Sequence, residues 1–180
     1  LFQPIDKAYI PLEDIFRQKT GRIIVAAFSS NIHRLQQVIN AADKFGRKVV
    51  LNGRSMVANI RIARALGYLT APDGLIFDLK ELDSLPPQRL VLLTTGSQGE
   101  PMSALTRMAL DNHKQVKVVK GDTVILSSKF IPGHEKAIST MMNHLYRRGA
   151  DVIYEKVSEV HVSGHASQEE LKIMLNMTKP

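Results

Sequence analysis

Residues 22–67 read RIIVAAFSSNIHRLQQVINAADKFGRKVVLNGRSMVANIRIARALG. The stretch holds two short apolar runs, at 22–28 and 48–53, and neither run alternates apolar with polar residues. Each run precedes a segment, 33–45 or 55–66, in which apolar residues recur every three to four positions up to a glycine. The pattern predicts strand, helix, strand, helix, with strands that are buried on both faces.

The same alternation continues along the chain. We predict further strands at 89–96, 122–128, 151–155 and 160–162, and further helices at 101–113, 134–148 and 167–177. Because strands and helices alternate, we expect an α/β, three-layer fold with a mostly parallel, Rossmann-like sheet and helices on both faces. Residues 1–18 are expected to form a junction and leading helix, and residues 19–180 the domain itself.

Two stretches are less regular. LIFDL, at 75–79, is a candidate edge strand in a region interrupted by prolines. VKVVKGDTVIL, at 116–126, could fold back at Lys120-Gly121-Asp122 as a tight hairpin, which would make one strand antiparallel.

Composition limits the class of protein. A length of 180 residues suits one domain, and the absence of cysteine excludes disulfides and thiolate metal sites. No apolar run reaches the ~18 residues of a membrane span and no secretory leader is recognisable, so we expect a cytoplasmic protein with no membrane partner. The charge balance, 24 − 17 = +7, weakly favours a polyanionic partner. The chain starts with Leu1 and stops after an amphipathic segment, and we interpret it as a fragment.

Small polar residues gather where predicted strands end. The turns are Ser29–Arg34, Asn52–Ser55, Thr94–Glu100, Ser127–Lys129 and Ser163–Ser167. Parallel strands with right-handed crossovers bring such turns to one edge, where α/β folds bind ligands. Helix N-termini and glycine-containing turns there could bind phosphates along a track. The alternative is ordinary helix capping, for example by Ser55 or by Ser167 with Glu170.

Other motifs are scarce. His161 and His165 are four residues apart, but the turn at Gly164 separates them, so a metal site built on this pair is not favoured. The remaining histidines are expected to lie mostly on the surface. The sequence contains no HxHxDH, GxxxxGK[ST] or GxSxG motif, so dinuclear-zinc, Walker-type and hydrolase-elbow functions lose their main support.

The turns resemble a known family. SSNIHRLQQVI, GRSM, LTTGSQGEPMSAL, KGDTVILSS, IPG and VHVSGHASQEELKIML are similar to successive signatures of bacterial ribonuclease J. The resemblance implies the β-CASP domain, an insertion in a metallo-β-lactamase nuclease that binds RNA between its two domains. It implies no cofactor in this fragment and two Zn²⁺ ions in the metallo-β-lactamase domain of the parent chain, which could also form a homo-oligomer.

The resemblance also assigns site residues. His165 is the expected catalytic residue, acting at the scissile phosphate by stabilising charge or transferring a proton. The expected RNA- or phosphate-binding residues are Ser30, Asn31, His33, Arg34, Arg54, Ser55, Ser97, Gln98, Glu100, Ser163, Gly164, Ala166 and Ser167. Of these, Glu100 would repel phosphate and is expected to order its loop. No residue of this chain is expected to bind metal.

Departures from the family define what the fragment can do. The resemblance implies that the parent cleaves RNA both from the 5′ end and internally. Because the zinc motifs are absent from this sequence, we expect this chain alone to be inactive. Two alternatives remain: a Rossmann-like domain that binds a nucleotide or sugar phosphate, or an inactive scaffold that serves as an assembly surface. The first would need a Gly-rich first turn, whereas the first strand here ends in SSNIHR.

Overall fold

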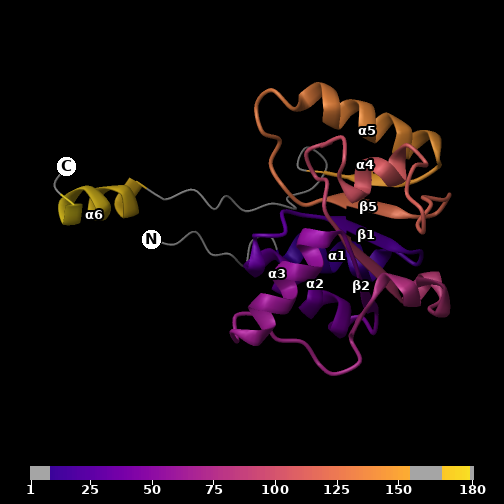
Figure 1. The fold of residues 1–180 in the computed structure, drawn as a ribbon, viewed down its shortest axis with the longest axis horizontal. Helices are drawn as coiled ribbons and strands as arrows, with labels where there is room; N and C mark the ends of the chain where they lie inside the picture. Colours follow the sequence, from indigo (N-terminus) through magenta and orange to yellow (C-terminus); the bar gives the residue numbers. More distant parts are fainter. Residues whose placement is uncertain (1–8, 155–167, 179–180) are drawn as a thin grey trace.

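The computed structural model describes residues 9–154 and 168–178. Within these residues the strands are β1 (Ile23–Ala26), β2 (Lys48–Asn52), β3 (Ile76–Phe77), β4 (Leu90–Thr94), β5 (Thr123–Leu126) and β6 (Asp151–Ile153). The helices are α1 (Tyr9–Gln18), α2 (Ile32–Lys44), α3 (Arg54–Ala65), α4 (Ala104–Ala109), α5 (Glu135–Arg147) and α6 (Gln168–Thr178), with short 3₁₀ turns η2 (Leu79–Ser84) and η3 (Pro87–Arg89) (Figure 1). The predicted strand at 160–162 lies outside the described residues.

The described strands form one parallel sheet in the order β3-β2-β4-β1-β5-β6. Its centre is β1, in which Ile23 aligns with Val91 of β4 on one side and with Thr123 of β5 on the other. The chain passes from β1 to β2 and leaves room between them, which β4 later fills. The predicted parallel α/β sheet is confirmed, and so is the edge strand near residue 76, which is β3.

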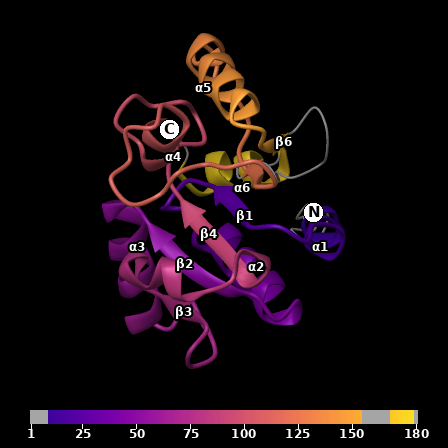
Figure 2. The same ribbon diagram turned by 90° about the vertical axis from the view of Figure 1, so that its right-hand side faces the viewer.

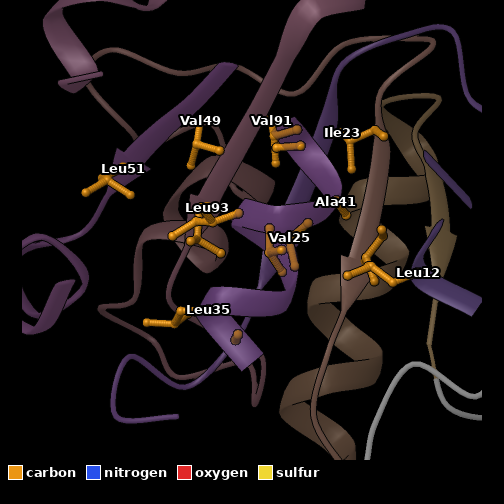
Figure 3. Packing of buried hydrophobic residues seen from close by; sticks show 14 of the residues in the cluster. Leu12, Ile23, Val25, Leu35, Ala41, Val49, Leu51, Val91 and Leu93 are labelled. Carbon is orange, nitrogen blue, oxygen red and sulfur yellow. The ribbon is translucent and has the colours of Figure 1, made fainter. Parts of the chain in front are cut away.

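Helices cover both faces of this sheet. Ile23 and Val25 of β1 share a buried cluster with Leu12 of α1 and Leu35 of α2 (Figure 3). Met56 of α3 belongs to the same cluster. The intervening strand residue, Ile24, belongs to a second cluster with α4 and α5. Successive residues of a strand point to opposite faces of the sheet. Because helices cover both faces, the side chains on both sides of such a strand are buried and apolar, which explains the uninterrupted apolar runs in the sequence.

The predicted antiparallel hairpin at 116–126 is wrong. Residues 116–118 belong to no strand, and Val116 and Val118 are buried in the second cluster. Asp122 instead closes a turn: its backbone N–H donates to the Val119 carbonyl (3.1 Å), and its carboxylate accepts from the Val119 N–H (2.9 Å). The chain therefore enters β5 through a side-chain-stabilised turn.

The helix predicted at 101–113 is much shorter. The Ser103 hydroxyl accepts a hydrogen bond from the Thr106 N–H at 3.3 Å, so α4 begins at Ala104. Asp111, with φ of 64°, adopts a left-handed conformation just after the helix end. The other described helices lie within about two residues of their predicted bounds. No helix in the described ranges combines the length and apolar character needed to cross a bilayer.

Candidate functional site

The loops that follow the strands meet along one edge of the sheet because all described strands point the same way. The chain leaves β1 and β2 toward α2 and α3 on one face of the sheet, and it leaves β4 and β5 toward α4 and α5 on the other face (Figure 2). Because the strand order is β2-β4-β1-β5, neighbouring strands lead to opposite faces. In open α/β folds, ligands bind beside the carboxyl ends of neighbouring strands whose chains leave toward opposite faces. We call this edge of the sheet the carboxyl edge.

Direct contacts tie these loops together. Gly53, with φ of 113°, approaches Thr95 so closely that an added Cβ would lie 2.9 Å from the Thr95 hydroxyl oxygen. The Asn59 side chain on α3 donates to the Ser29 hydroxyl at 3.2 Å. The loops after β1, β2 and β4 are therefore neighbours, and the predicted positions Asn31, Arg54 and Ser97 lie on loops or helix starts at the same edge.

The predicted binding residues at the surface of this edge carry hydrogen-bond donors. Ser30, His33, Arg54 and Ser55 are exposed. Asn31 is partly buried and caps α2, because its side-chain oxygen accepts from the Arg34 N–H at 3.1 Å. Hydroxyl, imidazole and guanidinium groups at helix starts suit an anionic ligand.

Three predicted binding residues are buried instead. Arg34 is 3% exposed, Ser97 0% and Gln98 1%. Burial lowers the pKa of the Arg34 guanidinium to about 10, because a charged group loses hydration inside the protein. Side chains covered to this degree shape the edge without presenting donors at its surface, and the direct ligand contact expected of them stays a prediction.

Gln98 joins the loop after β4 to the loop after β5. Its side-chain nitrogen donates to the Ser128 hydroxyl and to the Lys129 carbonyl, each at 2.8 Å, and its side-chain oxygen accepts from the Ile131 N–H at 2.9 Å. The Glu100 carboxylate accepts from the Gln98 N–H at 3.1 Å, so Glu100 orders the same loop. These contacts fix two loops of the carboxyl edge relative to one another.

The arrangement agrees with comparison to known proteins. Residues 20–145 match the family model described as the ribonuclease J β-CASP domain. This chain belongs to the ribonuclease J β-CASP family. Similar proteins are ribonuclease J of Thermus thermophilus (50% identical over 169 residues) and of Synechocystis (46% over 178), and ribonuclease J2 of Bacillus subtilis (45% over 169). The alignments cover 94%, 98% and 94% of this chain, respectively. They cover 29%, 28% and 30% of those proteins, so the chain spans less than a third of the length of these relatives.

The predicted catalytic residue, His165, and its neighbours Ser163, Gly164, Ala166 and Ser167 lie outside the described residues. Across residues 9–154 and 168–178, no three His, Asp or Glu side chains come together in a way that could hold a metal ion.

The sequence did not reveal a polar pair beneath the edge of this β-CASP domain. His113, expected at the surface, is buried, and one of its ring nitrogens, Nε2, lies 3.1 Å from the side-chain oxygen of Asn52 at the end of β2. Its other nitrogen, Nδ1, accepts from the N–H groups of Gln115 (3.3 Å) and Val116 (3.1 Å), so the proton of the neutral ring is on Nε2. The expectation that most of the remaining histidines lie at the surface therefore does not hold for His113.

The stability of this domain is expected to fall as the pH drops below the ordinary histidine pKa. Burial, and secondarily the charge of Arg107, lowers the pKa of His113 from 6.5. The folded state therefore disfavours the protonated ring, and stability is lost as the pH falls from about 6.5 toward the lowered value, where the unfolded chain binds the extra proton. Urea unfolding at several pH values should show this loss, and His113→Gln should reduce it.

The matched variant for that measurement is His144→Gln, which removes a histidine from α5. If His113→Gln retained the full pH dependence of the unmodified chain, the buried imidazole would not be its source.

Proposed function

We propose that this chain is the RNA-clamping domain of a ribonuclease J-type, zinc-dependent nuclease that cleaves RNA from the 5′ end and internally during RNA processing, including that of ribosomal RNA, in the cytoplasm. The observation that carries the proposal is the carboxyl edge, where exposed donors from separate loops line one side of the sheet in a family whose relatives are named ribonuclease J. Two zinc ions would belong to a metallo-β-lactamase domain encoded outside these 180 residues. When bound there, they would supply an activated hydroxide for attack on phosphorus.

Each group of residues has a separate task in this proposal. Exposed Ser30, His33, Arg54 and Ser55 would bind phosphate oxygens, because these side chains can donate to an anion. The buried Gln98 would hold the loops in the shape that the strand requires. Since the residues that would activate water lie elsewhere, this chain by itself would bind RNA without cleaving it.

His165 would act at the scissile phosphate, and Ser163, Gly164, Ala166 and Ser167 would bind phosphate beside it. This role comes from the resemblance of the SGHAS segment to the family motif. In a protein that carries both domains, His165→Ala should lower turnover far more than RNA affinity, and unchanged turnover would exclude a catalytic role.

RNA binding by the 180-residue chain should weaken with salt and depend on Arg54. Each phosphate contact in single-stranded RNA adds about 0.7 to the slope of log affinity against log salt. Fluorescence anisotropy with a short 5′-phosphorylated RNA should therefore show a shallower slope for Arg54→Ala, together with a loss of affinity of about tenfold.

Arg147→Ala is the matched control. Arg147 is an exposed arginine at the C-terminal end of α5, so this variant removes the same charge away from the carboxyl edge. Equal losses in the two variants would indicate attraction by net charge alone, and an affinity independent of salt would contradict a phosphate-binding edge.

A further inference from the structure

A separate cavity lies on the flank of the sheet. It has a volume of about 560 Å³ and is formed by α3, the end of β2, β3 and the start of η2. Its apolar lining includes Leu51, Ile60, Ile76 and Phe77. Figure 2 shows α3 next to β2 and β3 at this side of the molecule. The volume is in the range of small-molecule sites, so the cavity could hold a ring system. We call it the α3–η2 slot.

One wall of the slot is cationic. Arg61 and Arg64 stand three positions apart on α3, so they share a helix face, and both line the cavity. Both side chains are exposed, and neither forms an ion pair or hydrogen bond with any residue in the described part of the chain. Two guanidinium groups are therefore available to an anion beside an apolar surface.

The part of the slot formed by Asp78 and η2 is anionic. Asp78 and Glu81 line it, and both take part in the start of η2: the Glu81 carboxylate accepts from the Asp78 N–H at 2.9 Å. Asp78 is paired only loosely with Lys80, at 3.8 Å. The two carboxylates thus hold their own turn and do not neutralise Arg61 and Arg64 across the slot.

This division of charge selects a class of ligand. Guanidinium groups bind phosphate through paired N–H donors, carboxylates accept from ribose hydroxyls and base amino groups, and the apolar lining suits a base. A simple polyanion would be repelled by Asp78 and Glu81, whereas a nucleotide presents an anion at one end and donors at the other.

We propose that the α3–η2 slot binds one nucleotide unit, with its phosphate at Arg61 and Arg64 and its sugar or base donors at Asp78 and Glu81. The source of the nucleotide rests on the proposed function: it is either part of the RNA strand or a mononucleotide released from it. Arg54, which starts α3 at the carboxyl edge, precedes Arg61 by seven residues, or ~10.5 Å of helix rise. A strand leaving that edge could follow the same helix to the slot.

The test is an NMR titration of the ¹⁵N-labelled 180-residue chain with CMP and, separately, with inorganic phosphate. CMP should shift the amide signals of residues around Phe77, Asp78 and Arg61, and should bind at least about tenfold more tightly than phosphate. The double variant R61A/R64A should weaken CMP binding by about tenfold or more, whereas Arg147→Ala should leave it unchanged. Both arginines are exposed, so the thermal unfolding midpoint of the double variant should match that of the unmodified chain.

Three results would overturn the slot: no CMP-dependent shifts at these residues, equal CMP affinity in R61A/R64A, or equal binding of CMP and phosphate. A short RNA then identifies the source. If R61A/R64A also weakens the RNA, the slot holds a nucleotide of the strand; if only CMP binding is lost, it holds a free nucleotide. Failure of the carboxyl edge is seen separately, as an Arg54→Ala variant with normal RNA affinity.

Discussion

Arg22→Ala is expected to lower the free energy of unfolding by about 3–5 kcal/mol, the usual range for breaking a buried ion pair. Arg22 donates two hydrogen bonds to the Asp122 carboxylate, from Nε at 3.0 Å and from Nη2 at 2.5 Å. Nη2 also donates to the Lys117 carbonyl at 2.7 Å. The two side chains are only 11% and 3% exposed. Removing the guanidinium leaves a buried carboxylate whose remaining described partner is the Val119 N–H. Urea denaturation followed by circular dichroism measures the loss.

The exposed pair Arg17–Asp14 provides the control. Its N···O distance of 2.6 Å is nearly as short, but its side chains are 62% and 46% exposed, so Arg17→Ala should cost no more than about 1 kcal/mol. Replacing both buried partners, as Arg22→Met with Asp122→Leu, should recover part of the loss because no charge is left unpaired. A loss below about 1 kcal/mol for Arg22→Ala would mean that water reaches Asp122.

Gln98→Ala is expected to cost about 3 kcal/mol, because it removes three hydrogen bonds at once, one buried and two partly buried. The Ser128 hydroxyl, the Lys129 carbonyl and the Ile131 N–H all lose the hydrogen bonds that the Gln98 amide makes. We expect the loops after β4 and β5 to separate, which hydrogen exchange at the Ile131 amide would detect as lost protection. RNA affinity should fall as well, if the edge needs both loops in place.

Ser97→Ala is the matched substitution one residue earlier. The Ser97 hydroxyl oxygen is buried without a hydrogen-bond partner among the described residues, so its removal should change the free energy of unfolding by less than about 0.5 kcal/mol. If Ser97→Ala and Gln98→Ala were equally destabilising, cavity formation in the loop would explain both results better than hydrogen bonding does.

Much of this fold could be predicted from the order of apolar runs. The strands at 23–26, 48–52 and 90–94 are apolar on both sides because helices cover both faces, and glycines mark where the helices stop. The predictions that failed concerned short local segments. The turn before β5 depends on the Asp122 side chain, and the short α4 depends on the Ser103 cap, and both are contacts between particular atoms that periodicity does not encode.

The candidate site was predicted less completely. The sequence order of strands and helices correctly predicts that Arg34, Arg54 and Gln98 lie at the same edge of the sheet. It does not predict which of these side chains point inward. Arg34 lies on the buried face of α2 and Arg54 on the exposed face of α3, a difference set by how each helix rotates against the sheet. His113 became a buried partner of Asn52 through a contact across 61 residues, which no local pattern reveals.

The late insertion of β4 between β1 and β2 bears on how the chain is made. β4 pairs with one edge of β1 and one edge of β2. Until residues 90–94 leave the ribosome, these two edges have no partner, although the helices that follow β1 and β2 are already complete. A nascent chain ending before that point therefore carries open strand edges on both β1 and β2, a form prone to pairing with other chains. Synthesis of β4 joins β1 to β2, and the other edge of β1 stays open until β5, at residues 123–126, has been made.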